Sequence, residues 1–459
     1  MKPTRRQVLR WIGVGTAISQ LGIPATATET ERVFVHPETG LLGDVLGAVD
    51  AVGGTVEREY DNFSFVLAEI PEGTIDELRS GPGVAFIERD SDVGVPSEWT
   101  PSVLDLLDPG DNADCSTHPS QRPSWGYERI GADEVEPDGS GVDIGILDTG
   151  IETGHCTLNV AGGRNFTDSV RPDDYEDRHG HGTHVAGVAS ALDNDLGVAG
   201  VAPNANLYAV KVLDDNGSGR YSTLVAGIDW CMSNGVELIS MSLGGESSSS
   251  TVDEAIEKAH SEGHLLICAA GNNGNDGAES CSEETMTYPA THEDVIAVSA
   301  MDEDDSLASY SSVGSAIDLL APGTAINSTY IDNTYAEASG TSIACPFVTG
   351  VAALVWQGRT DESNRNEVVR SILSETAEDV LEACAEGNGL VDARAAVSSE
   401  GSGGSDGGPV SDDPSPEREN GNGNGEPVGQ GDDSESQSVL ERFGGFIQRF
   451  LEYLQRIFQ

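Results

Sequence analysis

The sequence predicts an α/β domain with a mostly parallel sheet over residues 141–397, preceded by a small α+β domain over residues 31–95. In the larger domain, apolar runs such as VDIGIL, LYAVKVL, VELISMSL and HLLICAA alternate with helical segments. Strands that are apolar throughout must be covered on both faces, which favours a parallel sheet between two helical layers. In such sheets functional side chains gather at the carboxyl ends of the strands.

The charge of the chain restricts its partners. Its 459 residues include 78 Asp and Glu against 24 Lys and Arg, a formal net charge of -54. Nucleic acid is therefore excluded as a partner, because phosphate binding needs a basic surface. The acidic residues are spread through periodic segments and loops alike, which indicates a solvated surface adapted to high salt, where the repulsion is screened. An ordinary acidic protein is the alternative interpretation.

Residues 1–27 have the pattern of a signal peptide. Basic residues are followed by an apolar run over Trp11–Ile23 and by the small residues ATA, which match cleavage after Ala27. The run is too short for a comfortable membrane span. TRRQVLR, at residues 4–10, resembles the twin-arginine export signal, so we expect a secreted, extracellular protein. An uncleaved anchor is the alternative.

Residues 31–95 alternate short extended and helical segments in the order βαββαβ, which predicts a ferredoxin-like domain. Any small binding domain fits this pattern. Its place between an export signal and a larger domain suggests a propeptide instead. Residues 96–120 are rich in Pro, Asp and Ser, and are interpreted as a processing linker and mature N-terminal segment.

Asp148 directly follows the apolar run VDIGIL. A carboxylate at the end of a buried strand is held rigidly and can orient an imidazole and stabilise its cation. A turn-forming aspartate is the alternative.

HGHGTHVAG places three histidines, His179, His181 and His184, at the start of a predicted helix. Their spacings of two and three, with glycines between them, do not match the spacing of four that metal-binding helices use. The glycines flanking His181 allow a second backbone to approach, so His181 is the candidate general base. His184 would lie inside the helix and is expected to be structural.

Two further polar residues accompany apolar segments. Asn272 follows the strand LLICAA, where its amide can donate to a developing oxyanion. Ser342, in SGTSIACPFVTG, begins an apolar helix, where unpaired N–H groups and the helix dipole favour negative charge. Pro346 is expected in the first turn of that helix. Taken alone, Asn272 could belong to a turn and Ser342 could be a helix cap.

DTG, HGHGTHVAG, AAGN and GTSIACP, with Asp148, His181 and Ser342 in this order, resemble the motifs of subtilisin-like serine proteases. With the acidic surface and the export signal, the chain resembles the halolysins, secreted subtilases of halophilic archaea. The resemblance implies a subtilisin-like three-layer catalytic domain at residues 121–397. It also implies that Ser342 is the nucleophile, His181 the general base and Asp148 its orienting group, while Asn272 stabilises the oxyanion.

The same resemblance implies a zymogen whose propeptide is an intramolecular inhibitor and chaperone, and whose mature form cleaves proteins and peptides with broad specificity. Substrate would pair with an edge formed by Gly217, Ser218 and Gly219, and the pocket for the residue before the cut would be lined by Ser242, Leu243 and Gly244. A catalytically inactive binding protein with this fold is the alternative function. A lipase is disfavoured, because lipases carry their serine in GxSxG, in the order Ser, Asp, His.

A structural calcium site is implied by a set of residues that match the family's ligands, namely Gln121, Leu192, Asn194, Leu196 and Val198. However, Thr157 stands where the family has a bidentate aspartate. Calcium prefers six to eight oxygens that include carboxylates, so calcium binding stays open.

The seven cysteines are an odd number, so at least one thiol is free or intermolecular. Cys268 and Cys345 lie in apolar motifs and are expected to be buried thiols.

Residues 398–437 are interpreted as a flexible acidic linker, and residues 438–459 as an amphipathic helix. This helix would contact a membrane surface, another copy or the catalytic domain.

Overall fold

The computed structural model describes residues 29–96, 99–104, 115, 120–167, 171–274, 284–360 and 362–399. The predicted export signal, the C-terminal helix and the acidic linker beyond Ser399 lie outside these residues. Within the described ranges, no helix has both the length and the hydropathy needed to cross a bilayer.

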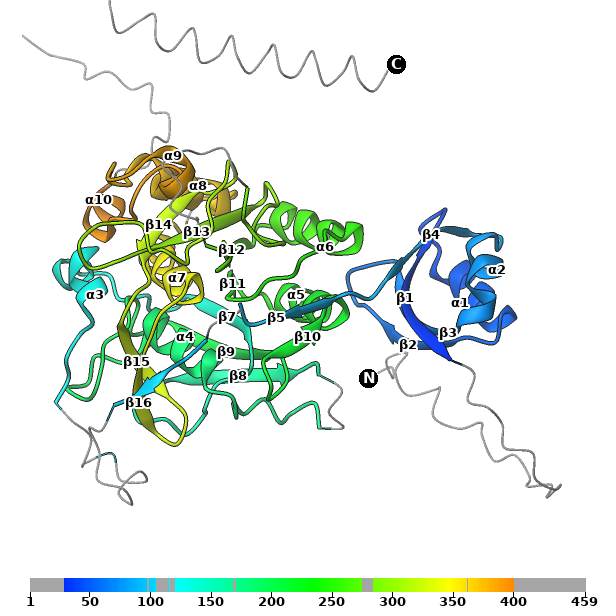
Figure 1. Cartoon of the computed structure of the whole chain (residues 1–459), viewed down its shortest axis with the longest axis horizontal. Helices are drawn as coiled ribbons and strands as arrows, with labels where there is room; N and C mark the ends of the chain where they lie inside the picture. Colours follow the sequence, from blue (N-terminus) through cyan, green and yellow to red (C-terminus); the bar gives the residue numbers. More distant parts are fainter. Residues whose placement is uncertain are drawn as a thin grey trace, which may run out of the picture. The chain divides into compact units, whose positions relative to one another are not determined.

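The N-terminal part is a four-stranded antiparallel sheet in the order β2-β3-β1-β4, with two helices on one face (Figure 1). Its elements follow the predicted βαββαβ order: β1 (Thr30–Pro37), α1 (Leu42–Ala51), β2 (Thr55–Glu59), β3 (Val66–Pro71), α2 (Ile75–Arg79) and β4 (Val84–Arg89). Val33 and Val35 pack with α1 and α2 in one core, whereas Phe34 between them belongs to the core shared with the larger domain. Successive side chains of β1 point to opposite faces of the sheet, so this strand contributes to both cores.

The larger domain contains a seven-stranded parallel sheet in the order β14-β13-β12-β11-β7-β9-β8. This confirms the predicted α/β class. The strands are β7 (Asp143–Asp148), β8 (Val160–Asn165), β9 (Asn206–Lys211), β11 (Leu238–Met241), β12 (Leu265–Ala269), β13 (Val295–Met301) and β14 (Leu319–Pro322).

Helices cover both faces of this sheet and complete three layers (Figure 1). Side chains of α4 (His181–Ser190) and α7 (Thr341–Gln357) share one core with Ile144 and Ile146 of β7. Those of α5 (Tyr221–Asn234) and α6 (Ser250–Ser261) share the other core with Leu147. The smaller helices are α3 (Trp125–Arg129), α8 (Arg365–Glu375), α9 (Ala383–Glu386) and α10 (Ala393–Ser398).

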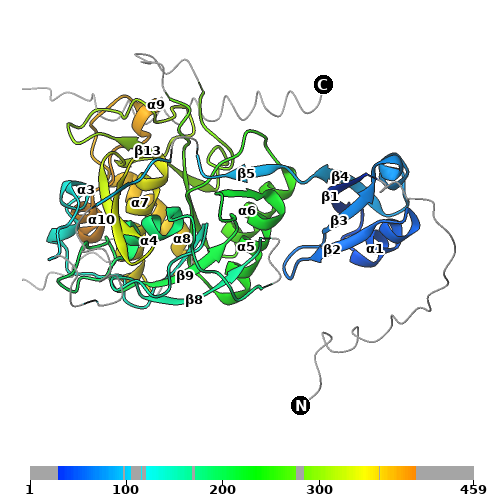
Figure 2. The same cartoon turned by 60° about the horizontal axis from the view of Figure 1, so that its bottom comes forward.

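The segment that follows β4 contributes one strand to each of two further sheets, which it shares with the larger domain. β5 (Asp92–Gly94) pairs antiparallel with β10 (Ser218–Arg220), beside which it lies in Figure 1. Figure 2 shows β5 in the stretch of chain that leads from β4 to the larger domain. β6 (Ser102–Val103) then joins the hairpin of β15 (Ile326–Tyr330) and β16 (Thr334–Ala338).

Carboxylates of the small domain bind the N-terminal turns of two helices in the larger one. Glu88 accepts hydrogen bonds from the backbone N–H and hydroxyl of Thr251 in α6, at 3.0 and 2.7 Å. Asp90 accepts the same pair from Ser222 in α5, at 2.9 and 2.7 Å. Because helix N-termini carry unpaired N–H groups and a positive dipole end, these contacts stabilise both helices.

Candidate active site

Asp148 and His181 form a buried pair at the carboxyl end of the sheet. Asp148 is the last residue of β7, and its two carboxylate oxygens lie 2.8 and 2.9 Å from Nδ1 of His181. A carboxylate only accepts hydrogen bonds, so Nδ1 carries the proton and Nε2 is the basic nitrogen. In the described part of the chain, Nε2 is buried and has no hydrogen-bond partner.

Two glycines, Gly180 and Gly182, flank His181, which is the first residue of α4. Gly180, the N-cap, has φ of +98°, and a Cβ there would collide with the ring of Tyr330. A Cβ on Gly182 would collide with the carbonyl oxygen of Gly150, in the loop that follows β7. The glycines therefore permit the helix end and this loop to touch.

His184 lies inside α4, as the sequence predicts. Its Nε2 is 3.2 Å from the carbonyl oxygen of Ile326 and 3.1 Å from that of Ala336, and burial lowers its pKa to about 3. This histidine is therefore neutral and structural.

Ser342 is the second residue of α7, after the N-cap Gly340, and is 3% exposed. Its carbonyl oxygen accepts a hydrogen bond of 2.7 Å from the hydroxyl of Ser242. Pro346 has no N–H with which to bond that carbonyl in the helix, which leaves the oxygen available to Ser242. The prediction that Pro346 lies in the first turn is wrong, because α7 already begins at Thr341.

Asn272 lies just after β12, and its amide oxygen accepts hydrogen bonds from the backbone N–H and the hydroxyl of Thr341, at 3.0 and 2.8 Å. These contacts orient the amide, so that Nδ2 is the donor. A Cβ on Gly340 would lie 3.2 Å from this Nδ2. The Asn272 amide is thus held at the N-terminus of α7, where an oxyanion would need it.

The predicted substrate edge and Gly244, one of the predicted pocket residues, flank the chain's own β5. Gly217 accepts a backbone hydrogen bond of 2.9 Å from Val95, and Ser218 and Gly219 pair in register with β5. Gly94 and Gly244 exchange two backbone hydrogen bonds, at 2.9 and 3.0 Å.

Ser242 and Leu243, both predicted to line the substrate pocket, are buried within the domain. Farther along the chain, the Trp99 ring packs edge-on against the His181 ring, with 4.6 Å between ring centroids. The chain's own β5 and Trp99 therefore lie against the predicted substrate-binding residues and His181.

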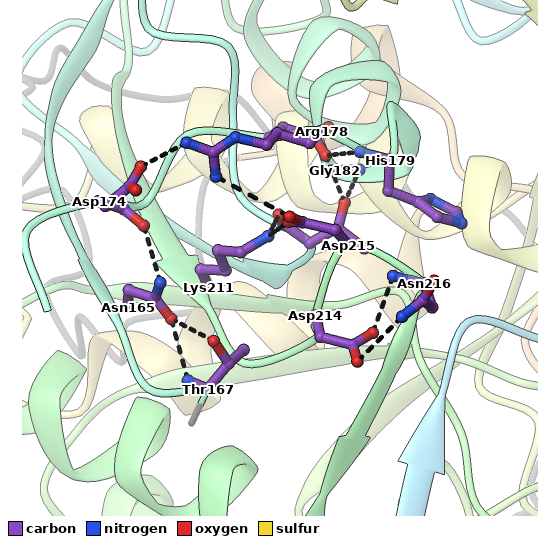
Figure 3. A network of polar contacts seen from close by, with 12 residues as sticks. Asn165, Thr167, Asp174, Arg178, His179, Gly182, Lys211, Asp214, Asp215 and Asn216 are labelled. Atoms are coloured by element: carbon purple, nitrogen blue, oxygen red, sulfur yellow. Dashed lines mark hydrogen bonds and ion pairs between the residues drawn. The ribbon is translucent and has the colours of Figure 1, made fainter. Parts of the chain in front are cut away.

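A network of charges lies beside the pair, and sequence reasoning missed it (Figure 3). Lys211 is buried in register with Asp148 on the neighbouring strand, and its amine binds the carbonyl of Thr149 and, at 2.9 Å, the carboxylate of Asp215. Arg178 lies 2.8 Å from Asp174 and 4.0 Å from Asp215. A lysine at the end of an apolar strand in so acidic a chain was a usable signal.

The residues predicted to bind calcium converge but do not fit that ion. Nε2 of Gln121 donates to the carbonyls of Leu192 and Val198, each at 3.3 Å. Asn194 donates to the Cys156 carbonyl and accepts from the backbone of Leu196.

The carboxylate that calcium prefers is missing from this set. Thr157 is buried, with its hydroxyl 3.1 Å from Nδ1 of His155. No group of three His, Cys, Asp or Glu side chains suited to a metal occurs within the described ranges. A disulfide between Cys115 and Cys156 instead fastens the segment that leads to Gln121.

The two cysteines predicted to be buried thiols, Cys268 and Cys345, are confirmed as such. Cys268 and Cys345 are free and buried, as is Cys231, whereas Cys384 is disulfide-bonded. The three thiols are therefore packing residues.

The subtilase family model matches residues 139–425. This chain belongs to the subtilase family. It is 44% identical to Subtilisin DY of Bacillus licheniformis over 282 residues, covering 61% of this chain and all (100%) of that protein. It is 38% identical to Subtilisin NAT of Bacillus subtilis subsp. natto, covering 75% of this chain and 84% of that protein.

A thermostable alkaline protease of Halalkalibacterium halodurans is 37% identical, with 84% of this chain and 98% of that protein covered. This subtilase is accordingly a subtilisin-like serine endopeptidase. Its resemblance to halolysins stays a prediction, because these relatives do not test it.

Proposed function

We propose that this subtilase is the zymogen of a secreted, broadly specific endopeptidase that uses Asp148, His181 and Ser342 as its catalytic triad. The observation that carries the proposal is the buried Asp148 carboxylate, with both oxygens within 2.9 Å of Nδ1 of His181. A binding protein that had lost catalysis would have no need to keep this geometry.

The mechanism follows from these positions. The Ser342 hydroxyl attacks the scissile carbonyl while Nε2 of His181 takes its proton. Asp148 holds Nδ1–H and stabilises the imidazolium. The Asn272 amide and the Ser342 backbone N–H bind the oxyanion. His181 then protonates the leaving amine, and water hydrolyses the acyl-enzyme.

Residues 31–95 act in this proposal as the propeptide. β5 pairs with the proposed substrate edge, and Trp99, shortly after the proposed propeptide, lies against His181. The alkaline protease match supports this role, because a match over 84% of the chain must include many residues before residue 139. The contacts of Glu88 and Asp90 with α6 and α5 would allow the propeptide to assist folding as well as inhibit.

Export by the twin-arginine route and function in high salt complete the proposal. The first rests on TRRQVLR, and the second on the net charge of -54, whose self-repulsion salt would screen.

Casein hydrolysis by the purified protein and its Ser342→Ala variant, in molar and in low salt, tests this function. We expect activity in molar salt and a loss of about 10⁶-fold in the variant. Two inert but folded proteins would support the inactive binding protein instead. Equal activity of both would indicate a contaminating protease.

A further inference from the structure

Asp177, shortly before His181, is buried at 4% exposure and accepts five hydrogen bonds. One oxygen accepts from the Thr149 hydroxyl at 2.9 Å and from the backbone N–H groups of His179 and Gly180 at 2.9 and 3.0 Å. The other accepts from the backbone and hydroxyl of Thr183 at 2.9 and 2.7 Å. All five contacts are donated to the carboxylate oxygens, so the site suits a side chain that offers acceptors on both of its terminal atoms.

These contacts connect the two sides of the Asp148–His181 pair. On one side, the backbone N–H of Thr149 donates to Asp148 at 2.7 Å, while the Thr149 hydroxyl binds Asp177. That hydroxyl also accepts from the backbone of Gly182 at 3.0 Å. On the other side, Asp177 accepts from the backbone N–H of Gly180. Of the two glycines that flank His181, Gly182 therefore binds Thr149 directly, and Gly180 is connected to Thr149 through Asp177.

Asp177 also replaces the missing cap of α4. Gly180 occupies the N-cap position and has no side chain, and the Asp177 carboxylate accepts from the third residue of the helix in its place. The helix dipole stabilises its negative charge there. Lys211 binds the carbonyl of Thr149 and places a cation next to that residue.

We propose that Asp177 is a positioning residue for catalysis, which fixes the imidazole of His181 against Asp148 through Thr149 and the first turn of α4. The proposal rests on the triad proposed above. Asp177 itself touches neither substrate nor Ser342.

Asp177→Asn in the full-length chain, matured and compared with the parent, is the test. Asparagine has the size of aspartate, but its NH₂ group would face the donors that bind one of the two carboxylate oxygens. We expect kcat to fall about 10- to 100-fold with KM within about twofold of the parent, as for a misplaced catalytic group. The rate of Ser342 labelling by a phosphonofluoridate should fall in parallel. The low-field proton resonance of Nδ1–H of His181 should shift or broaden.

Asp173→Asn is the matched control, because Asp173 lies in the same loop but is exposed and pairs with Arg164, outside the charge network beside the site. It should change kcat less than about twofold. If Asp177→Asn does not fold, Thr149→Val is measured by the same readouts. This substitution removes only the hydroxyl that binds Asp177, and we expect it to lower kcat about tenfold.

A parental kcat and a parental proton resonance in a folded Asp177→Asn protein would overturn the proposal, as would a variant that loses only thermal stability. If the parent shows no Ser342-dependent hydrolysis, the triad fails, whereas the proton resonance still reports on the positioning.

Discussion

Thr149 lies between two buried carboxylates, with its backbone N–H on Asp148 and its hydroxyl on Asp177. One small side chain thus couples the orienting carboxylate to the helix that carries the imidazole. Ser242 has a comparable role at Ser342, whose carbonyl it binds where Pro346 cannot. At the residue scale, the candidate site is held by short hydrogen bonds to groups next to the reacting ones.

Glu152 is a nearby residue with a pH-dependent effect on stability. Its carboxylate accepts the backbone N–H of Asn333 at 2.9 Å, yet burial raises its pKa from 4.5 to about 7. The negative charges of Glu176, Asp332 and Asp177 act in the same direction. The folded state therefore binds this proton more tightly than the unfolded state does. The contribution of Glu152 to stability is thus fully present below about pH 4.5 and is lost as the pH rises through about 7.

The substitution Glu152→Gln should remove this loss of stability at high pH. In a Ser342→Ala background, which prevents self-digestion, we expect a Tm about 2 to 5 °C above that of the background protein at pH 8, and no gain below about pH 4.5. The difference in Tm is measured by thermal unfolding at several pH values between about 4.5 and 8, at constant salt. The exposed Glu293→Gln is the control. A gain of the same size at both pH values would show that the titration of Glu152 is not the cause.

At the element scale, the N-terminal segment of the larger domain is fastened to its neighbours by protein contacts. Gln121 and Arg122 donate backbone hydrogen bonds to Asp195 and Gly197, at 3.0 and 2.7 Å. The disulfide from Cys115 to Cys156 spans a sequence separation of 41 residues. These contacts hold the segment at the place where the family resemblance implies calcium.

A Cys115→Ser, Cys156→Ser double variant should therefore unfold about 5 to 10 °C lower than its parent, because it loses the restriction that the disulfide places on the unfolded chain. EGTA should leave the parent Tm unchanged. Calorimetry in a Ser342→Ala background measures both effects. A Tm that falls with EGTA and is indifferent to the disulfide would show that calcium, and not the covalent link, fastens this segment.

At the scale of the whole molecule, the parts that could be predicted are those that local patterns encode. Fully apolar strands such as VDIGIL specify a sheet covered on both faces, and the glycines around His181 mark a close approach of two backbones. Asp177 could not be predicted, because its link to Asp148 runs through the hydroxyl of Thr149, which lies in a separate segment and is brought close only by the fold. The same holds for Trp99 against His181 and for the partner of Cys115, since both depend on tertiary contacts.

Within the described residues, segments before residue 105 lie against the candidate site. The small domain packs on α5 and α6, β5 lies between Gly217 and Gly244, and Trp99 covers His181. This arrangement supports the proposal that the protease cuts its own propeptide.

The N-terminus of the mature protein is the most direct test of this account. The purified full-length chain and its Ser342→Ala variant would be incubated in molar salt and analysed by intact mass and N-terminal sequencing. The account predicts a cut between Val95 and Trp99 in the parent and none in the variant. A cut elsewhere, or the same cut in both proteins, would contradict it.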